Sequence, residues 1–353
     1  ARANEVFTEV VEKTEVPVVT TIMGRGAVPT DHPLYIGNLG MHGAYASNMA
    51  VSECDLLFSI GTRFNDRITG KLHEFAPNAQ IVHIDTASIS RNIHVDVPIV
   101  ADALEAVTKM NEYVEHCETK KWRKQIAEWK EEHPLTMKNR VDMGPQDIIE
   151  EINRQFDNAI IATDVGQHQM FTTQYIEITK NKQLITSGGL GTMGYGFPAA
   201  IGAKLGNPDK DVIAISGDGG MQMNIQEFAT AVLEELPLIL CVFNNEYLGM
   251  VRQWQKLFYG KRYSMTNLKS GALFRRTNGQ EMPEYTPDFV KLAESYGAKG
   301  IRVMKKEDIA AAFEEAKKNT KTPTLIEFVI NPEELVYPMV QPGGTLEDLI
   351  MDC

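Results

Sequence analysis

The sequence has few cysteines and no long apolar run. Its four cysteines, Cys54, Cys117, Cys241 and Cys353, lack the spacing of a metal-ligand set. Sparse cysteine of this kind is typical of a reducing compartment, and we expect the cytoplasm or an organelle stroma. No apolar run approaches the length of a membrane span, so we expect no membrane partner.

Positive charge is also in short supply. The chain has 35 Lys and Arg against 47 Asp and Glu, which gives a formal net charge of -12. This balance disfavours a nucleic-acid surface as the main partner, and we expect small molecules and protein subunits instead. With 353 residues and 43% hydrophobic content, the chain is predicted to be a globular protein of about two domains.

The most informative stretch runs from residue 211 to residue 245. It reads as an apolar strand, the turn GDGG at 217–220, a helix, a second apolar strand and the pair NN at 244–245. A crossover of this length makes the two strands parallel, so Asp218 and Asn245 should emerge at the carboxyl edge of one sheet. Their oxygens suit Mg²⁺ beside a polyphosphate. Two turns that merely reverse the chain are the less favoured alternative.

Helices and strands alternate along both halves of the chain, which predicts an α/β fold of two doubly wound parallel-sheet domains. We expect a first domain over 1–117, a charged linker over 118–144, a second domain over 145–335, and a C-terminal tail over 336–353 without a sheet partner. The first domain opens on a helix, so we expect its first strand and further upstream residues to be missing. The expected strands are 16–22, 56–60, 80–84, 97–100, 159–163, 183–186, 212–216 and, as the last of the chain, 324–329.

Three loops that follow strands of the first domain look suited to a ligand, at 23–26, 61–67 and 85–86. Asp85 is placed either to accept from ribose hydroxyls or to cap a helix, with even odds. Arg63 and Arg67 suit anion binding or a solvated loop, and the local residues leave both open. His42, alone before a helix, is by itself more typical of a satisfied polar residue than of a ligand.

In the second domain, a series of glycines lies between the strand 183–186 and the next helix. This series indicates close backbone approach to a ligand, with loop flexibility as the alternative. Asn224, with Glu227 three residues later, has the spacing of a capping box for the following helix. The helix 248–258 carries an apolar stripe that by itself indicates core.

The sequences GDG at 217–219 and NN at 244–245 match the thiamine diphosphate signature. Further segments narrow the resemblance: VGQHQM at 165–170, TSGGLGTMGYG at 186–196, GMVRQWQ at 249–255, GTRFNDRITG at 61–70 and LGMHG at 39–43. Together they resemble the catalytic subunit of acetohydroxyacid synthases, also called acetolactate synthases, over nearly the whole chain. The resemblance implies most of a middle, FAD-associated domain and a complete thiamine diphosphate domain. It also implies that the N-terminal aminopyrimidine-binding domain, which carries the catalytic glutamate, is absent.

The resemblance implies three sets of site residues. The Mg²⁺ ligands are Asp218, Asn245 and the backbone carbonyl of Tyr247. The thiamine diphosphate positions are Val165, Gly166, Gln167, His168, Gly191, Met193, Gly219, Gly220 and Met250, of which Met193 would hold the cofactor bent. The FAD positions are Thr21, Ile22, Leu39, Met41, His42, Gly61, Arg63, Asn65, Arg67, Ile68, Asp85, Asp102 and Gln169.

The implied reaction decarboxylates pyruvate and transfers its two-carbon unit to a second pyruvate or to 2-oxobutanoate, in branched-chain amino acid biosynthesis. Arg67 and Trp254 match residues that select and hold the second 2-oxo acid, and with Met193 they form the implied catalytic set. Trp254 and its neighbours Met250 and Val251 would then line a substrate channel. FAD would be structural, without net redox chemistry.

The implied partners are a second catalytic subunit in a homodimer or tetramer, the missing N-terminal domain and a small regulatory subunit. Two alternatives remain open. One is another thiamine diphosphate-dependent carboligase, oxidase or decarboxylase, and the other is a cofactor-binding fragment without turnover.

The chain departs from the family pattern in two places. Asn65 stands where the family commonly has a second aspartate. The loop from Met265 to Thr286 is longer than the family pattern, and we expect a solvated insertion rather than a segment that reshapes the mouth of the site.

Overall fold

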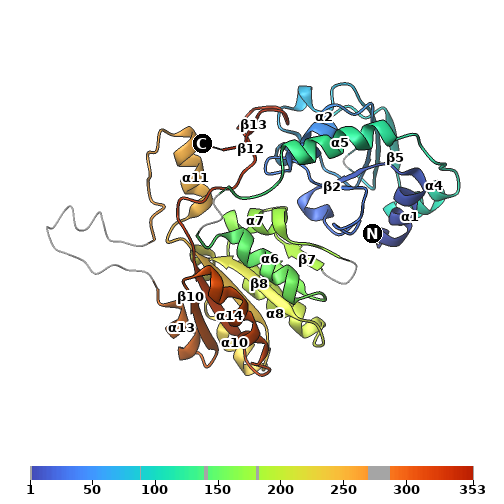
Figure 1. The fold of residues 1–353 in the computed structure, drawn as a ribbon. Coiled ribbons are helices and arrows are strands. Elements are labelled where there is room, and N and C mark those ends of the chain that lie inside the picture. The colour runs from blue at the N-terminus through green and yellow to red at the C-terminus, as the bar shows by residue number, and fades with distance from the viewer. Residues whose placement is uncertain (1, 88, 139–141, 180–182, 269–286, 353) are drawn as a thin grey trace. The chain divides into compact units, whose positions relative to one another are not determined.

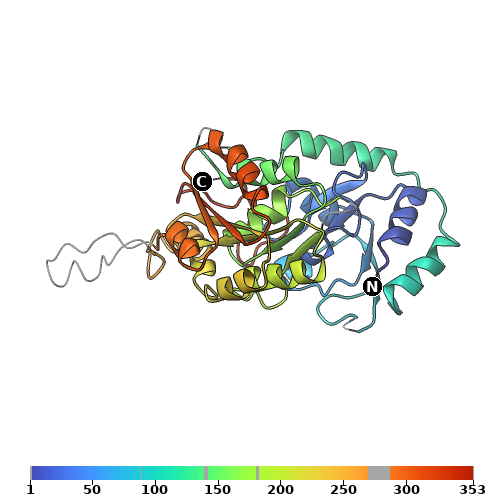
Figure 2. The same cartoon turned by 90° about the horizontal axis from the view of Figure 1, so that it is seen from below.

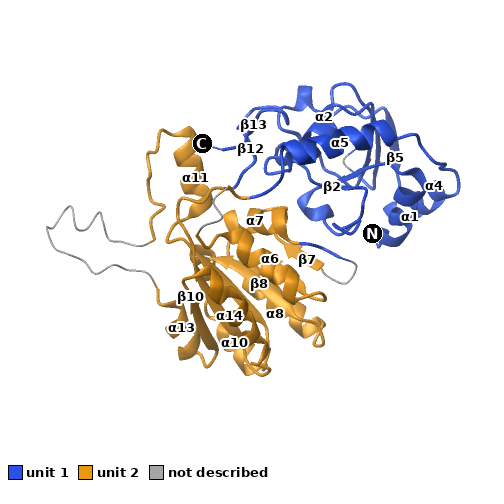
Figure 3. Cartoon of the chain, viewed as in Figure 1, with its two compact units in different colours: residues 1–136, 177–180, 336–353 blue, residues 137–176, 181–335 orange. Residues whose placement is uncertain are grey.

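The computed structural model describes residues 2–87, 89–138, 142–179, 183–268 and 287–352. The chain forms two compact units (Figure 3). Unit 1 consists of residues 1–136, 177–180 and 336–353, and unit 2 consists of residues 137–176 and 181–335. Each unit combines parallel strands with helices, so the expected α/β fold class is confirmed.

Unit 2 is built on a six-stranded parallel sheet with the order β10-β11-β9-β8-β6-β7 (Figure 1). Its strands are β6 (Ile160–Thr163), β7 (Gln183–Thr186), β8 (Val212–Gly217), β9 (Ile239–Asn244), β10 (Lys299–Val303) and β11 (Thr324–Val329). β8 and β9 are parallel neighbours, with Gly217 opposite Phe243, as the crossover predicts. Every residue of these two strands is buried, as in parallel sheets that are covered on both faces.

One face of this sheet is covered by three helices, α8 (Gly196–Gly206), α10 (Glu227–Leu233) and α13 (Phe289–Ser295). Phe197, Phe228 and Phe289 from these helices join one core cluster with alternate residues of the strands. The alternation follows from the period of two in a strand, which sends successive side chains to opposite faces.

The other face is covered by α6 (Pro145–Gln155), α7 (Gln167–Tyr175) and α14 (Ile309–Lys317) (Figures 1 and 2). The rings of Phe156 and Phe328 each lie 5.7 Å from the ring of Phe313 and link this helical layer to β11. The described residues of the unit also form three short or separate helices, α9 (Asp218–Met221), α11 (Gly249–Phe258) and η3 (Lys306–Asp308). Across the described part of the chain, every helix is too short or too polar to cross a bilayer.

The strand order of this sheet reverses between β6 and β8. From β6 the chain moves to β7 on one side, and from β8 it moves to β9 on the other. Such a switch point opens a crevice at the carboxyl ends of the two strands, which is where α/β proteins bind ligands. Residues 164–168 and 218–220 leave the sheet at this crevice.

Unit 1 contains two small parallel sheets, β1-β2 and β3-β4-β5, and an antiparallel pair, β12-β13. Its strands are β1 (Val18–Thr20), β2 (Tyr35–Asn38), β3 (Leu56–Ile60), β4 (Gln80–Asp85), β5 (Val97–Val100), β12 (Met339–Val340) and β13 (Leu349–Ile350). Its helices are α1 (Asn4–Thr14), η1 (Ile22–Gly24), α2 (Tyr45–Ser52), α3 (Asp66–Thr69), η2 (Leu72–Glu74), α4 (Ala103–Asn111) and α5 (Lys120–Glu132). β1 is shorter than the expected strand 16–22, and β2 was not expected, since four residues show too little periodicity.

The expectation that residues 336–353 form a tail without a sheet partner is wrong. β12 and β13 pair with each other, so β11 is not the last strand. Val340 donates its N–H to the Met41 carbonyl at 2.8 Å, and Leu346 is buried in a core cluster of unit 1. Strands of two residues carry no periodic signal, so only the folded chain reveals them.

Candidate functional site

Asp218 occupies the center of the crevice at the carboxyl end of β8. Its side chain is only 3% exposed, and one carboxylate oxygen, Oδ1, accepts the N–H of Gly219 at 2.9 Å. The other oxygen, Oδ2, is buried and has no hydrogen-bond donor among the described residues. Burial raises the pKa of Asp218 to about 7. A carboxylate in this state is stabilised by a cation that replaces the lost water.

The turn that follows β9 presents the other two expected metal ligands. Glu246 has a positive φ of 64°, and its N–H donates to Asn244 Oδ1 at 3.1 Å. The N–H of Tyr247 donates to Asn245 Oδ1 at 3.1 Å. Tyr247 pairs with Asn267 in an antiparallel bridge whose hydrogen bonds come from residues 246 and 248, so the carbonyl of Tyr247 points away from residue 267.

Gln167 has a role that the sequence did not reveal. It was expected beside the diphosphate, but its amide is buried and occupied by protein groups. Its Oε1 accepts from Asn245 Nδ2 at 3.2 Å, while its Nε2 donates to Gln253 Oε1 at 2.8 Å and to the Glu334 carbonyl at 3.2 Å. The Gln167 side chain therefore orients Asn245.

His168 lies in the crevice between two glycines. A Cβ atom at Gly166 or Gly217 would come within 2.9 Å of its ring, and Gly166 has a positive φ of 148°, so both positions require glycine. Burial lowers the pKa of His168 to about 4, which keeps the ring neutral at pH 7. Its Nε2 is buried and has no hydrogen-bond partner among the described residues, and a protonated Nε2 can donate to an anion.

Asp164 is the residue of the crevice that the sequence analysis missed. Its carboxylate accepts the N–H groups of Gly194 at 2.9 Å, Gly196 at 3.1 Å and Val165 at 2.7 Å. It thereby ties the glycine loop before α8 to the carboxyl end of β6. The available signal was an acidic residue directly after a buried strand, the same pattern as at Asp218.

The glycine loop is held at a second point by Asn224. Its Nδ2 donates to the Gly194 carbonyl at 2.7 Å, while α10 begins at Glu227 without a side-chain cap. The expected capping box at Asn224 is therefore wrong. The Asn224 amide contacts a residue 30 positions earlier in the chain, which no local spacing predicts.

Met193 and the glycines of the two loops also meet at this crevice. A Cβ atom at Gly219 would lie 3.1 Å from Met193 Cε, and one at Gly220 would lie 2.9 Å from Asp164 Oδ1. Gly191 has a positive φ of 64° and lies beside Val165. The close approach of these groups explains why glycine occupies both positions after Asp218.

Helix α11 buries polar residues and leaves part of its apolar stripe open. Its buried residues are Arg252 and Gln253, whereas Val251 is 50% exposed. Met250 and Trp254 are half-buried, and the Trp254 ring packs edge-on against Phe258 at 5.3 Å. Interpreting the stripe as core is therefore wrong for this helix.

The loop 265–286 was expected to be a solvated insertion. Only its residues 265–268 are described, so this expectation lies largely outside the described residues.

In unit 1, the positions expected to contact FAD all lie at the carboxyl ends of parallel strands. One of them is the last residue of a strand, and the others follow a strand. They come after β1 (Thr21, Ile22), β2 (Leu39, Met41, His42), β3 (Gly61, Arg63, Asn65, Arg67, Ile68) and β5 (Asp102), with Asp85 the last residue of β4. Gln169 belongs to unit 2, where its Nε2 donates to Thr186 Oγ1 at 2.7 Å.

The loops after β2 and β3 are joined to each other. Met41 donates its N–H to the Arg67 carbonyl at 2.8 Å, and Arg67 Nη1 lies 3.5 Å from Met41 Sδ. His42 is buried, with Nδ1 3.3 Å from the Pro338 carbonyl, and burial lowers its pKa to about 4. Asn65 Oδ1 is buried and has no donor among the described residues. This loop pair thus gathers neutral polar groups around Arg67.

The two aspartates among the expected FAD positions, Asp85 and Asp102, differ in their roles. Asp102 is the N-cap of α4 and accepts the N–H groups of Leu104 and Glu105 at 2.8 and 3.4 Å. Asp85 accepts the N–H of Ala87 at 3.2 Å, and no helix begins in the described residues between Asp85 and β5. The helix-cap alternative for Asp85 is therefore wrong, and Asp102 is the residue that caps.

The groups at the carboxyl edge of unit 2 fit a divalent cation with hard oxygen ligands. Asp218 Oδ2 lacks a donor, Asn245 supplies an amide oxygen, and Tyr247 supplies a carbonyl on the same turn. Mg²⁺ binds through one or two carboxylates and keeps positions for water and phosphate oxygens. Within the described residues, no group of three or more His, Cys, Asp and Glu side chains forms a further metal cluster.

Two family models match the chain. Residues 1–110 match the central domain of thiamine pyrophosphate enzymes, and residues 164–328 match their C-terminal TPP binding domain. The two matches coincide with the main segments of units 1 and 2.

Curated relatives match almost the whole chain. The chain is 42% identical over 360 residues to the acetolactate synthase large subunit of Cyanidium caldarium, covering 99% of this chain and 59% of that protein. It is 42% identical over 361 residues to the probable acetolactate synthase large subunit of Methanocaldococcus jannaschii, covering 99% and 58%. It is 40% identical over 358 residues to the acetolactate synthase of Mycobacterium bovis, covering 98% and 56%. The chain thus spans less than two thirds of the length of these relatives.

The raised pKa of Asp218 predicts how stability depends on pH in the absence of a divalent cation. The folded chain holds this proton up to about pH 7, whereas the unfolded chain releases it near pH 4, so the contribution of Asp218 to the free energy of unfolding falls as pH rises through this window. Relative to Asp218→Asn, wild type should lose on the order of 4 kcal/mol across this window, because it spans about three pKa units and each unit is worth about 1.4 kcal/mol. Urea unfolding of both proteins below and above the window checks this, and parallel pH profiles would contradict it.

Proposed function

The chain belongs to the thiamine pyrophosphate enzymes, and we propose that it is the cofactor-holding part of an acetolactate synthase catalytic subunit. The observation that carries the proposal is Asp218, a buried carboxylate with one unsatisfied oxygen at the switch point of the unit 2 sheet. The similarity to acetolactate synthase large subunits over 99% of the chain supports the choice within the family.

Asp218, Asn245 and the carbonyl of Tyr247 would hold Mg²⁺. A bound cation would replace the missing donor at Asp218 Oδ2 and remove the cost of a buried negative charge. The Asn245 amide is already oriented for this role, because Gln167 holds its Nδ2 and thereby directs its Oδ1 away from Gln167. The cation would in turn neutralise the diphosphate of the cofactor.

The diphosphate would lie against residues 165–168, Gly219 and Gly220. His168 offers a buried Nε2, and the glycines leave room for the close approach of phosphate oxygens. Gly191, which lies beside Val165, and Met193, which lies beside Gly219, would support the thiamine part of the cofactor, together with Met250.

When bound, thiamine diphosphate supplies the carbanion chemistry that decarboxylates a 2-oxo acid and joins its two-carbon unit to a second one. The substrates would be pyruvate and either a second pyruvate or 2-oxobutanoate, giving acetolactate or acetohydroxybutanoate for branched-chain amino acid biosynthesis. Arg67 would bind the carboxylate of the acceptor, for which the guanidinium fork is suited. Trp254, half-buried on α11, would select the acceptor by its size.

FAD would bind unit 1 at the carboxyl ends of its parallel strands, with a structural role. The buried Asn65 Oδ1 and the open space around Gly61, whose φ is 67°, support a ligand at the loop after β3. A second catalytic subunit and a small regulatory subunit would complete the enzyme, in the cytoplasm or an organelle stroma.

Replacement of Asp218 tests the cation site. Asp218→Ala should abolish Mg²⁺-dependent binding of thiamine diphosphate, because the variant lacks the only buried carboxylate with an unsatisfied oxygen at the carboxyl ends of β8 and β9, within the described chain. Calorimetric titration of thiamine diphosphate with and without Mg²⁺ measures this. Asp211→Ala is the matched control, since Asp211 is exposed at the opposite end of β8. Unchanged affinity in Asp218→Ala would refute the cation site.

A second candidate is a cofactor-binding module without turnover, which the match of residues 164–328 to a TPP binding domain also fits. If the chain is such a module, the 353-residue polypeptide should bind thiamine diphosphate with Mg²⁺ but form no acetolactate from pyruvate. Colorimetric detection of acetolactate over time measures this turnover. Robust product formation by this polypeptide alone would exclude the module and favour the complete activity.

A further inference from the structure

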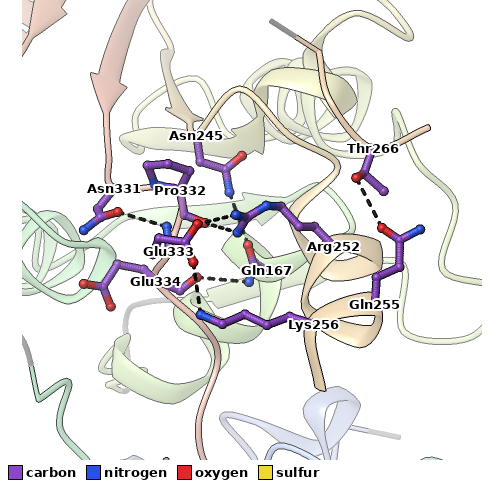
Figure 4. Close-up of polar contacts among 10 residues, drawn as sticks. All are labelled: Gln167, Asn245, Arg252, Gln255, Lys256, Thr266, Asn331, Pro332, Glu333 and Glu334. Atoms are coloured by element: carbon purple, nitrogen blue, oxygen red, sulfur yellow. Dashed lines mark hydrogen bonds and ion pairs between the residues drawn. The ribbon is translucent and has the colours of Figure 1, made fainter. Parts of the chain in front are cut away.

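Arg252 is a buried cation near the start of α11, in the helix turn that faces the loop after β11. It is 7% exposed, and its guanidinium makes two polar contacts with that loop (Figure 4). Nη1 donates to the Pro332 carbonyl at 2.8 Å, and Nη2 forms an ion pair with the Glu333 carboxylate. These contacts fasten α11 to residues 332–333.

The same guanidinium lies over two aromatic rings. It is 4.6 Å from the center of the Tyr247 ring and 4.8 Å from that of Tyr263. A flat, weakly hydrated cation between two rings is favoured in a buried setting, and lysine cannot reproduce this geometry. Arg252 therefore holds the side chain of the residue whose backbone carbonyl is a proposed Mg²⁺ ligand.

From Tyr247, a chain of hydrogen bonds leads through Asn245 and Gln167 back to the loop after β11, which Arg252 also contacts. Tyr247 donates its N–H to Asn245 Oδ1, and Asn245 Nδ2 donates to Gln167 Oε1. Gln167 Nε2 then donates to the carbonyl of Glu334, the residue next to the ion-pair partner of Arg252 (Figure 4). Each proposed ligand on the turn after β9 is thus held from two directions, and Arg252 supplies one of them for Tyr247.

We propose that Arg252 is a positioning residue that keeps Tyr247 and Asn245 in their cation-binding arrangement by joining α11, the loop 332–334 and the Tyr247 ring. The inference rests on the proposed function, since it takes Asn245 and Tyr247 as Mg²⁺ ligands. It also links the helix that carries Trp254 to the cofactor's metal site. Groups that orient metal ligands without touching the metal typically change metal affinity by about 10- to 100-fold when they are replaced.

Lys256, one turn further along α11, provides a matched control. Its Nζ lies 3.0 Å from the same Glu333 carboxylate, on the oxygen that Arg252 does not contact. Both residues therefore neutralise Glu333, but Arg252 in addition lies over the Tyr247 ring. Comparing variants of Arg252 and Lys256 therefore separates the positioning of residues 245–247 from the loss of an ion pair with Glu333.

The test measures the Mg²⁺ concentration needed for half-maximal thiamine diphosphate binding, by calorimetry, in wild type, Arg252→Met and Lys256→Met. Arg252→Met should raise this concentration about tenfold or more, because the Tyr247 ring loses its contact with the guanidinium and the turn 245–247 is held less firmly. Lys256→Met should stay within about twofold, because a partly exposed ion pair contributes little. Melting temperatures are recorded in parallel, since a purely structural role would lower them without moving the Mg²⁺ requirement.

An Arg252→Met midpoint close to that of wild type, or an equal shift in Lys256→Met, would overturn the inference. If Arg252→Met does not fold, Tyr247→Leu decides, because it keeps the backbone carbonyl but removes the ring, and an unchanged Mg²⁺ requirement would again overturn it. Failure of the proposed function gives a different result, in which wild type and Asp218→Ala bind thiamine diphosphate equally at all Mg²⁺ concentrations.

Discussion

The buried carboxylate of Asp218 is the constraint on which the site of this protein depends. It lies at the end of a strand whose residues are all buried, and one of its oxygens has no donor within the described structure. An isolated charge in such a place is costly, and burial raises the pKa of Asp218 to about 7 as a result. A folded chain tolerates this cost where a bound ligand offsets it, which supports the proposal that the groups around Asp218 form a cation site.

The neighbouring polar groups hold the turn after β9 and the glycine loop before α8 in place. Asp164 fixes the loop before α8 through three N–H groups, and Gln167 fixes Asn245. On the sheet side, the buried Glu327 accepts from Asn244 Nδ2 at 2.7 Å and from Arg302 Nε at 2.7 Å. Gln167 from α7 and Glu327 from β11 thus hold Asn245 and Asn244, the residues that precede Glu246, which has a positive φ.

Helix α11 also places buried polar side chains next to the turn after β9. Its polar residues Arg252 and Gln253 are buried, where Arg252 lies over the Tyr247 ring and Gln253 accepts from Gln167, and the exposed Val251 lies on the same helix. An amphipathic helix of a simple core would show the opposite pattern. In unit 1, the loops after β2 and β3 likewise gather polar groups at strand ends, and Arg67 is joined there to Met41 by both its backbone and its side chain.

The sequence by itself determined the elements that arise from local pattern. The strands 56–60, 97–100, 183–186 and 324–329 have the predicted bounds, because apolar runs between turn residues are local signals. The order of β8, α10 and β9 also determined that Asp218 and Asn245 share one edge, because a parallel crossover permits little else.

Only the tertiary structure decided which groups contact the residues at this edge. Asn245 is oriented by Gln167, 78 positions away, and Arg252 is held by Glu333, 81 positions away. Asn224 turned out to support Gly194 rather than a helix, and the strands β12 and β13 were too short to predict. Such contacts join side chains that are distant in the chain, and their partners depend on the packing of whole elements rather than on any spacing that the sequence displays.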